Sequence, residues 1–67
     1  MSVARNTEIS ATSTKSFDDA LRQGIARATK TLRNVTGAWI MEQEVRLKGD
    51  EIVEYKVVMV VTFILEG

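Results

Sequence analysis

Two pairs of carboxylates are the side chains of this sequence best able to do acid–base or metal chemistry. Asp18 and Asp19 are adjacent, and Glu42 and Glu44 stand two residues apart. The chain has no His and no Cys, so it lacks an imidazole base and a thiolate nucleophile. Its four glycines are too scattered to form a phosphate-binding loop. We therefore expect a protein that is not an enzyme.

Basic residues gather in the middle of the chain, at Arg22, Arg27, Lys30 and Arg33. They could hold phosphate groups at a junction between subunits, although a charged helix face in water is the commoner explanation. Over the whole chain nine basic residues balance nine acidic ones. A neutral domain has no overall attraction to nucleic acid or to an anionic membrane, so we expect neither partner.

The length of 67 residues predicts a single domain, residues 1–67. The opening residues, MSVARNTEIS, lack the apolar stretch of a secretory signal. The most apolar run, VVMVVTFIL at residues 57–65, is too short to cross a bilayer as a helix. We expect a soluble, cytoplasmic protein.

A helix is predicted to begin at Ser16 and to end near Arg33 or Asn34. Ser16 and Asp19 have the spacing of a capping box, and Asn34 tolerates the left-handed conformation found after helix ends. Gly24 lies within the helix, where it predicts the close approach of a strand or a neighbouring subunit. A single apolar stripe is predicted at Phe17, Leu21, Ile25, Ala28 and Leu32.

Three strands surround this helix, with a break at Thr36-Gly37 before the second and a tight reversal at Gly49-Asp50 before the third. The strands are predicted at residues 3–11, 38–48 and 52–66. In the second strand, alternation places Trp39 on the same face as the other odd-numbered residues, opposite Glu42 and Glu44. The odd positions of the third strand are all apolar or aromatic: Val53, Tyr55, Val57, Met59, Val61, Phe63 and Leu65.

The predicted fold is therefore α+β, with the order β-α-β-β. A crossover helix makes the first two strands run in the same direction, and the hairpin returns the third strand antiparallel to both. The third strand is the most apolar and can pair with both others only from the centre. We expect a three-stranded antiparallel sheet of order 1-3-2, with the helix packed on one face.

The third strand is apolar on both faces, and one helix can cover only one of them. Val58, Val60 and Ile64 would then face water, although burial of each would contribute roughly 1.5–3 kcal/mol. A chain of this size is marginal as an isolated fold. A homo-oligomer would cover the second face, whereas the simpler explanation is that β-branched residues favour strands wherever they lie.

The combination of elements and residues resembles the dodecin family over nearly the whole chain. The similarity lies in Thr12-Ser13 before the helix, Ser16-Phe17 at its start, the IARA segment at residues 25–28 and the TLRNV segment at residues 31–35. The end of the last strand is also similar, at Tyr55, Val57, Phe63, Leu65 and Glu66. The resemblance implies a hollow homododecamer that binds flavins such as FMN or riboflavin.

The resemblance also implies where a flavin would bind, and this sequence departs from the family pattern there. In typical dodecins a Trp stacks on the isoalloxazine ring and a Gln bonds its polar edge. Those positions correspond here to Gly37 and Lys56. Gly has no ring to stack, and Lys only donates hydrogen bonds. Trp39 lies two residues further on, either as a displaced stacking platform or as a core or interface aromatic.

Some dodecins lack the flavin Trp and have been linked to calcium, and the segment from Met41 to Val45 is similar to an acidic segment in them. Glu42 and Glu44 are the metal-ligand candidates, with a solvated acidic edge as the simpler explanation. Together these observations predict a non-enzymatic, dodecin-like shell that binds or stores a small ligand through an altered or lost flavin site. The alternatives are a purely structural shell and a calcium-stabilised one.

Overall fold

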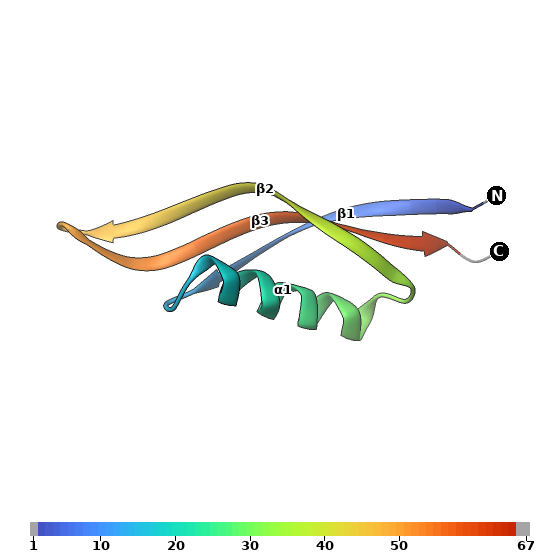
Figure 1. Ribbon diagram of the computed structural model, residues 1–67, viewed down its shortest axis with the longest axis horizontal. Coiled ribbons are helices and arrows are strands. Elements are labelled where there is room, and N and C mark those ends of the chain that lie inside the picture. Colours follow the sequence, from blue (N-terminus) through green and yellow to red (C-terminus); the bar gives the residue numbers. More distant parts are fainter. Residues whose placement is uncertain (1, 66–67) are drawn as a thin grey trace.

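The computed structural model describes residues 2–65, which form one sheet with a helix on one face (Figure 1). The elements in chain order are β1 (Val3–Ser13), α1 (Phe17–Thr31), β2 (Val35–Lys48) and β3 (Glu51–Leu65). β1 and β2 both pair antiparallel with β3, so the sheet order is β1-β3-β2. The predicted β-α-β-β fold and the central position of the third strand are confirmed. No helix among residues 2–65 is long and apolar enough to cross a membrane.

Helix α1 begins where predicted and ends earlier. Ser16 is the N-cap, and its hydroxyl oxygen accepts a hydrogen bond from the backbone N–H of Asp19 at 2.9 Å. The C-cap is Leu32, so the predicted end near Arg33 or Asn34 is two to three residues too late. Asn34 does adopt the left-handed conformation, with φ of 60°, but it does so in the turn into β2.

The strands are longer than predicted, chiefly at the start of β2. The expected break at Thr36-Gly37 is wrong because both residues belong to β2, where the pairing with β3 shifts between Val35 and Gly37. β1 extends to Ser13, and Gly49 makes the predicted reversal with φ of 63°. The expected end of the third strand at Glu66 lies outside the described residues.

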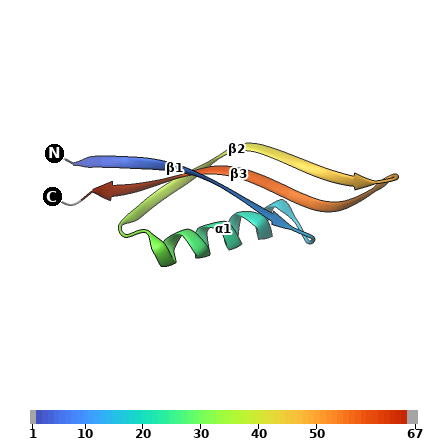
Figure 2. The ribbon, with the colours of Figure 1, turned by 180° about the vertical axis from the view of Figure 1, so that it is seen from behind.

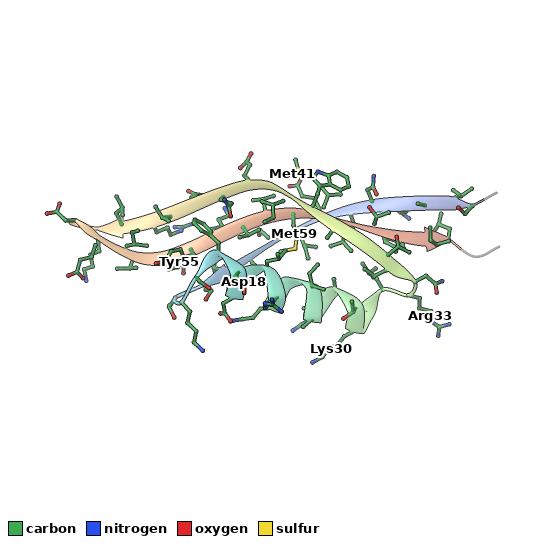
Figure 3. All side chains as sticks on the ribbon, in the orientation of Figure 1. Asp18, Lys30, Arg33, Met41, Tyr55 and Met59 are labelled. Atoms are coloured by element: carbon green, nitrogen blue, oxygen red, sulfur yellow. The ribbon has the colours of Figure 1, made fainter. Side chains whose placement is uncertain are left out.

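The core lies between α1 and the odd-numbered residues of β3, as the alternation predicted. Val57, Met59 and Val61 are completely buried beneath the helix, and Figure 3 shows Met59 between α1 and the sheet. The buried helix positions are Ala20, Gly24 and Ala28. Of the predicted apolar stripe only Ala28 is buried, while Phe17, Leu21, Ile25 and Leu32 are partly exposed at its flanks. Small residues therefore bring the helix close to the sheet.

Gly24 is the point of closest approach between α1 and the sheet. A Cβ atom at this position would lie 2.6 Å from Cε of Met59 on β3 and 3.3 Å from Cβ of Ala11 on β1. The close approach predicted for Gly24 is thus to strands of its own chain.

Helix α1 packs on β1 and β3 and leaves β2 uncovered. Apart from Val35, every residue of β2 is exposed, on both faces of the sheet. The β2–β3 hairpin extends beyond the N-terminal end of α1, so the molecule measures 51 by 19 by 13 Å (Figures 1 and 2). The exposed large apolar residues of β2 are Trp39, Ile40, Met41, Val45 and Leu47.

Candidate functional site

The five residues proposed from the sequence as ligand or metal contacts lie on the face of the sheet opposite α1, here called the helix-free face. They are Gly37, Trp39, Lys56, Glu42 and Glu44. This face carries the even-numbered residues of β1 and β3, because the odd-numbered ones lie under the helix. The residues of β2 paired with even positions of β3 share it. Gly37 is opposite Thr62, Trp39 opposite Val60, Glu42 opposite Val58, and Glu44 opposite Lys56.

A β-bulge at Met41 brings Trp39 and the two glutamates to the same face. The pairing of β2 with β3 shifts between Ile40 and Glu42, so one extra residue interrupts the alternation. The prediction that Trp39 lies on the face opposite Glu42 and Glu44 is therefore wrong. The sequence signal was weak, since Ala38 to Met41 is a continuous apolar run without alternation.

Trp39 is the aromatic side chain of this face, and it is half exposed, with 50% of its surface accessible. Val60, its partner on β3, is only 8% exposed although no helix covers it. Val60 lies on the central strand between Trp39 on β2 and Glu8 on β1, and these larger neighbours shield it. The expectation that Val60 is open to water in a single chain is wrong, whereas Val58 and Ile64 do keep partial exposure.

Gly37 lies at open backbone. A Cβ added there would meet no atom within 4 Å, so neither packing nor positive φ requires a glycine. Gly37 pairs with Thr62 of β3, and Thr62 is six residues from Lys56 on that strand. At about 3.3 Å per strand residue, they are separated by roughly 20 Å along the sheet. The two positions of one chain are too far apart to contact one flavin ring together.

Lys56 is partly buried and engaged with a neighbour. Its side chain is 29% exposed, and Nζ lies 3.7 Å from Oε1 of Glu44 on β2. A cross-strand ion pair of this length in a partly exposed position is weak, on the order of 0–1 kcal/mol. Lys56 can therefore exchange Glu44 for an anionic group of a ligand at low cost.

Glu42 and Glu44 share one face, as predicted, but they do not form a metal centre within one chain. No group of three or more acidic residues that could hold an ion occurs among residues 2–65. Calcium takes six to eight oxygen ligands, so these two carboxylates would need contributions from other copies. Glu44 is also the ion-pair partner of Lys56.

The other carboxylate pair, Asp18 and Asp19, has a structural role at the start of α1. Asp18 accepts a hydrogen bond from Nε of Arg22 at 2.8 Å. Asp19 accepts from Ser13 and Gln23, each at 2.6 Å. The hydrogen bond from the Ser13 hydroxyl is the main reason that the pKa of Asp19 is lowered. This network joins β1 to α1 and accounts for both residues without catalysis.

The family model described as Dodecin matches residues 3–66 of this chain. The chain belongs to the dodecin family. Dodecins are small ligand-binding proteins that bind flavins and form dodecamers. A comparison with curated proteins finds no match.

Solved dodecin structures have the same fold over nearly all of the chain. A variant of the Thermus thermophilus dodecin is 31% identical, with a TM-score of 0.93 and complete coverage of both chains. The dodecin from Streptomyces davaonensis is 35% identical, with a TM-score of 0.91, over 98% of this chain and 97% of the other. The calcium dodecin from Mycobacterium tuberculosis, described as calcium chelating, shares the fold at 22% identity and a TM-score of 0.83, over 96% and 91%.

The assignment of Gly37, Trp39, Lys56, Glu42 and Glu44 as ligand or metal residues stays a prediction. Among the polar residues of the helix-free face that sequence reasoning missed, Glu8 and Asn6 of β1 lie beside the candidate residues. Glu8 shares Val60 with Trp39, and Asn6 accepts a hydrogen bond from the Thr62 hydroxyl at 2.8 Å. The even parity of these two β1 residues was the available signal, but β1 alternates too weakly for the sequence to fix its faces.

Proposed function

We propose that this dodecin assembles into a hollow homododecamer in the cytoplasm and binds or stores a small aromatic ligand, without catalysing a reaction. The observation that carries the proposal is the position of Trp39. It is half exposed, on the helix-free face, and on the same side of the sheet as Gly37 and Lys56. An aromatic ring held there can stack on a planar ligand.

Self-association is supported by the apolar surface that a single chain leaves open. Among residues 2–65, nine large apolar side chains are between 37% and 61% exposed. Together they present on the order of 800 Å², which is about what each partner contributes to a standard interface. Five of the nine lie on β2, which α1 does not cover on either face. Copies of the same chain would bury this strand.

The two positions that correspond to the usual flavin contacts do not fit a flavin ring in the usual way. Gly37 offers open backbone and no ring, and Lys56 is paired with Glu44. The remaining platform is Trp39, which lies on the same face as Gly37, about 6.6 Å further along β2. We therefore propose an altered flavin site with lower affinity for the neutral ring, in which Lys56 tolerates an anionic group.

Enclosure and stacking are the mechanism of binding. Residues about 20 Å apart in one chain meet a common ligand only when different copies supply them, so each pocket would lie at a junction between subunits. A flavin, when bound, would bring its own redox chemistry. The protein residues would supply a stacking surface through Trp39 and charge pairing through Lys56.

Two alternative functions assume the same homo-oligomeric shell and differ in what the shell binds. A purely structural shell would bind no small molecule. A calcium-stabilised shell would use Glu42 and Glu44 from several copies, because the described part of one chain has no group of three or more acidic residues that could hold the ion. The first proposal is preferred because Trp39 offers a half-exposed stacking surface, whereas two carboxylates supply few of the six to eight oxygen ligands that calcium takes.

Flavin titration of the purified protein separates these functions. Riboflavin and FMN are added while flavin fluorescence and the visible spectrum are recorded. The proposal expects saturable quenching, with FMN bound at least as tightly as riboflavin because of Lys56. Protein that is colourless as purified and quenches neither flavin at any concentration would contradict the ligand-binding role and leave the structural shell.

A further inference from the structure

Trp39 has open space beside it on the helix-free face. Its indole is half exposed, and Val60, its partner on β3, forms an apolar floor that is only 8% exposed. Gly37, two residues before Trp39 on the same face, has no side chain, and a Cβ atom there would meet no atom within 4 Å. A flat ring can therefore approach Trp39 over the open backbone at Gly37.

A carboxylate faces Trp39 across the sheet. Glu8 of β1 and Trp39 of β2 both pair with Val60, from opposite sides of the central strand. Neighbouring strands are about 4.8 Å apart, so the backbones of Glu8 and Trp39 are separated by roughly 10 Å. Both side chains are exposed. A fused aromatic ring system can span this distance, with the indole at one side and the carboxylate at the other.

A second carboxylate lies beside Trp39 along β2. The bulge at Met41 brings Glu42 to the helix-free face, where it pairs with Val58. Val58 is two residues from Val60 on β3, so Glu42 lies about 6.6 Å further along the sheet than Trp39. Neither Glu8 nor Glu42 forms an ion pair with any of residues 2–65.

The helix-free face is acidic as a whole. Among residues 2–65 it carries four carboxylates and two cations, a net charge of −2. These residues are Glu8, Glu42, Glu44, Glu54, Arg46 and Lys56. Arg46 pairs with Glu54 at 3.1 Å, and Lys56 pairs with Glu44 at 3.7 Å. The two carboxylates of the described face that lack a counter-ion are thus the two beside Trp39.

Lys56 does little to cancel the negative charge around Trp39. It lies four residues from Val60 along β3, which places it roughly 13 Å from the row of Trp39. Exposed charges at this distance are largely screened at physiological ionic strength. Glu44, in the same row as Lys56, also offsets its charge.

We propose that Trp39 binds a planar aromatic cation, such as a quaternised nitrogen heterocycle, in preference to a neutral ring of the same shape. The face of an indole ring attracts cations more strongly than that of Tyr or Phe. Glu8 and Glu42 supply the counter-charge from two sides. This inference rests on the stacking proposed for Trp39 and names the charge of the ring that stacks there.

The fluorescence of Trp39 measures this preference, because Trp39 is the only tryptophan of the chain. The probes are N-methylacridinium, a planar cation, and acridine, which carries no charge in neutral buffer. A chelator is present so that no divalent cation occupies the carboxylates. We expect both probes to quench saturably, with a dissociation constant on the order of tenfold lower for N-methylacridinium. Added salt should narrow this difference, since it screens the exposed carboxylates.

Variants of the two carboxylates test where the preference comes from. Glu8→Gln and Glu42→Gln, alone and combined, should weaken the binding of N-methylacridinium and leave the binding of acridine close to that of the wild type. Glu51→Gln removes the same charge at the hairpin turn, nine residues from Val60 along β3, and is the matched control. Trp39→Leu should abolish the binding of both probes, measured by the fluorescence of the probes themselves.

The outcomes separate this inference from the proposed function. Equal dissociation constants for the two probes, unchanged by Glu8→Gln and Glu42→Gln, would overturn the cation preference and leave the stacking on Trp39 in place. Probes that do not quench Trp39, or that bind Trp39→Leu as well as the wild type, would overturn both. The expected cation preference in a protein that binds no flavin would support this inference and contradict the flavin-binding role.

Discussion

Trp39 lies directly opposite Val60 on the helix-free face, and the two side chains differ sharply in exposure, at 50% and 8%. The central strand is thus already shielded by its neighbours, while the edge strand β2 remains open. The surface that requires a partner is therefore β2 and the outer side of Trp39, rather than the valines of β3. This shifts the expected interface and ligand platform toward the edge of the sheet.

Restoring the usual aromatic and amide residues should strengthen flavin binding. Gly37→Trp places a ring on the helix-free face at a position where an added Cβ meets no atom within 4 Å. Lys56→Gln removes the ion pair with Glu44 and offers an amide that donates and accepts. We expect the double variant to bind riboflavin on the order of tenfold tighter, measured by fluorescence quenching. Lys48→Gln, which removes a cation from the exposed end of β2, is the control.

No gain in the double variant would mean that Gly37 and Lys56 do not correspond to the family's flavin positions.

Gly24→Ala should destabilise the fold. The new methyl group would meet Cε of Met59 at 2.6 Å and Cβ of Ala11 at 3.3 Å. The flexible end of Met59 can move, so we expect a cost of about 1–3 kcal/mol from overpacking, reduced by up to about 1 kcal/mol of helix propensity. Denaturant unfolding at fixed protein concentration measures the difference. Gly37→Ala is the matched control, and a Gly24→Ala protein as stable as wild type would refute this packing.

Acid should weaken the junction between β1 and α1. The hydrogen bond from Ser13 is the largest cause of the lowered pKa of Asp19. Burial raises this pKa, whereas the hydrogen bond from Gln23 and the charge of Lys15 lower it further. The stability from ionised Asp19 is present above its ordinary pKa of 3.8 and is lost as the pH falls through that value and below. Ser13→Ala should therefore lose stability at pH 7 and show a shallower decline below pH 4. Thr14→Ala is the control, and parallel pH profiles for wild type and Ser13→Ala would contradict the linkage.

Removal of divalent cations should leave the thermal stability unchanged. The helix-free face of one chain presents Glu42 and Glu44 close together, and Glu44 pairs with Lys56. A chelator added before a melting scan tests this expectation. A fall in the melting temperature that calcium reverses, and that Glu42→Gln abolishes, would favour the calcium-stabilised shell instead.

The fold was predictable because its strongest signals are local. The capping Ser16, the apolar odd positions of β3 and the Gly49-Asp50 reversal each specify an element without reference to distant residues. The sequence did not predict on which face of the sheet the β2 residues after Met41 lie. A β-bulge shifts the alternation of side chains by one residue and leaves no sign in the composition. The end of α1 was predicted too late because Leu32 is apolar and continues the spacing of the helical stripe. In the structure Leu32 is the C-cap.

Sequence reasoning proposed candidate residues for the site, and their role stays a prediction; it did not predict how they are arranged. Alternation and resemblance pointed to Trp39, Gly37 and Lys56, yet only the register showed that all three share one face with Glu42 and Glu44. How these residues meet a ligand depends on neighbouring copies, which one sequence does not place.

The molar mass in solution tests the central claim most directly. The claim is that copies of the chain cover the open β2 strand and the helix-free face. Light scattering coupled to size-exclusion chromatography should give about twelve times the 7.5 kDa of one chain, roughly 90 kDa, at micromolar concentration. A stable, folded species of 7.5 kDa would contradict it, because β2 and Trp39 would then face water in the native state.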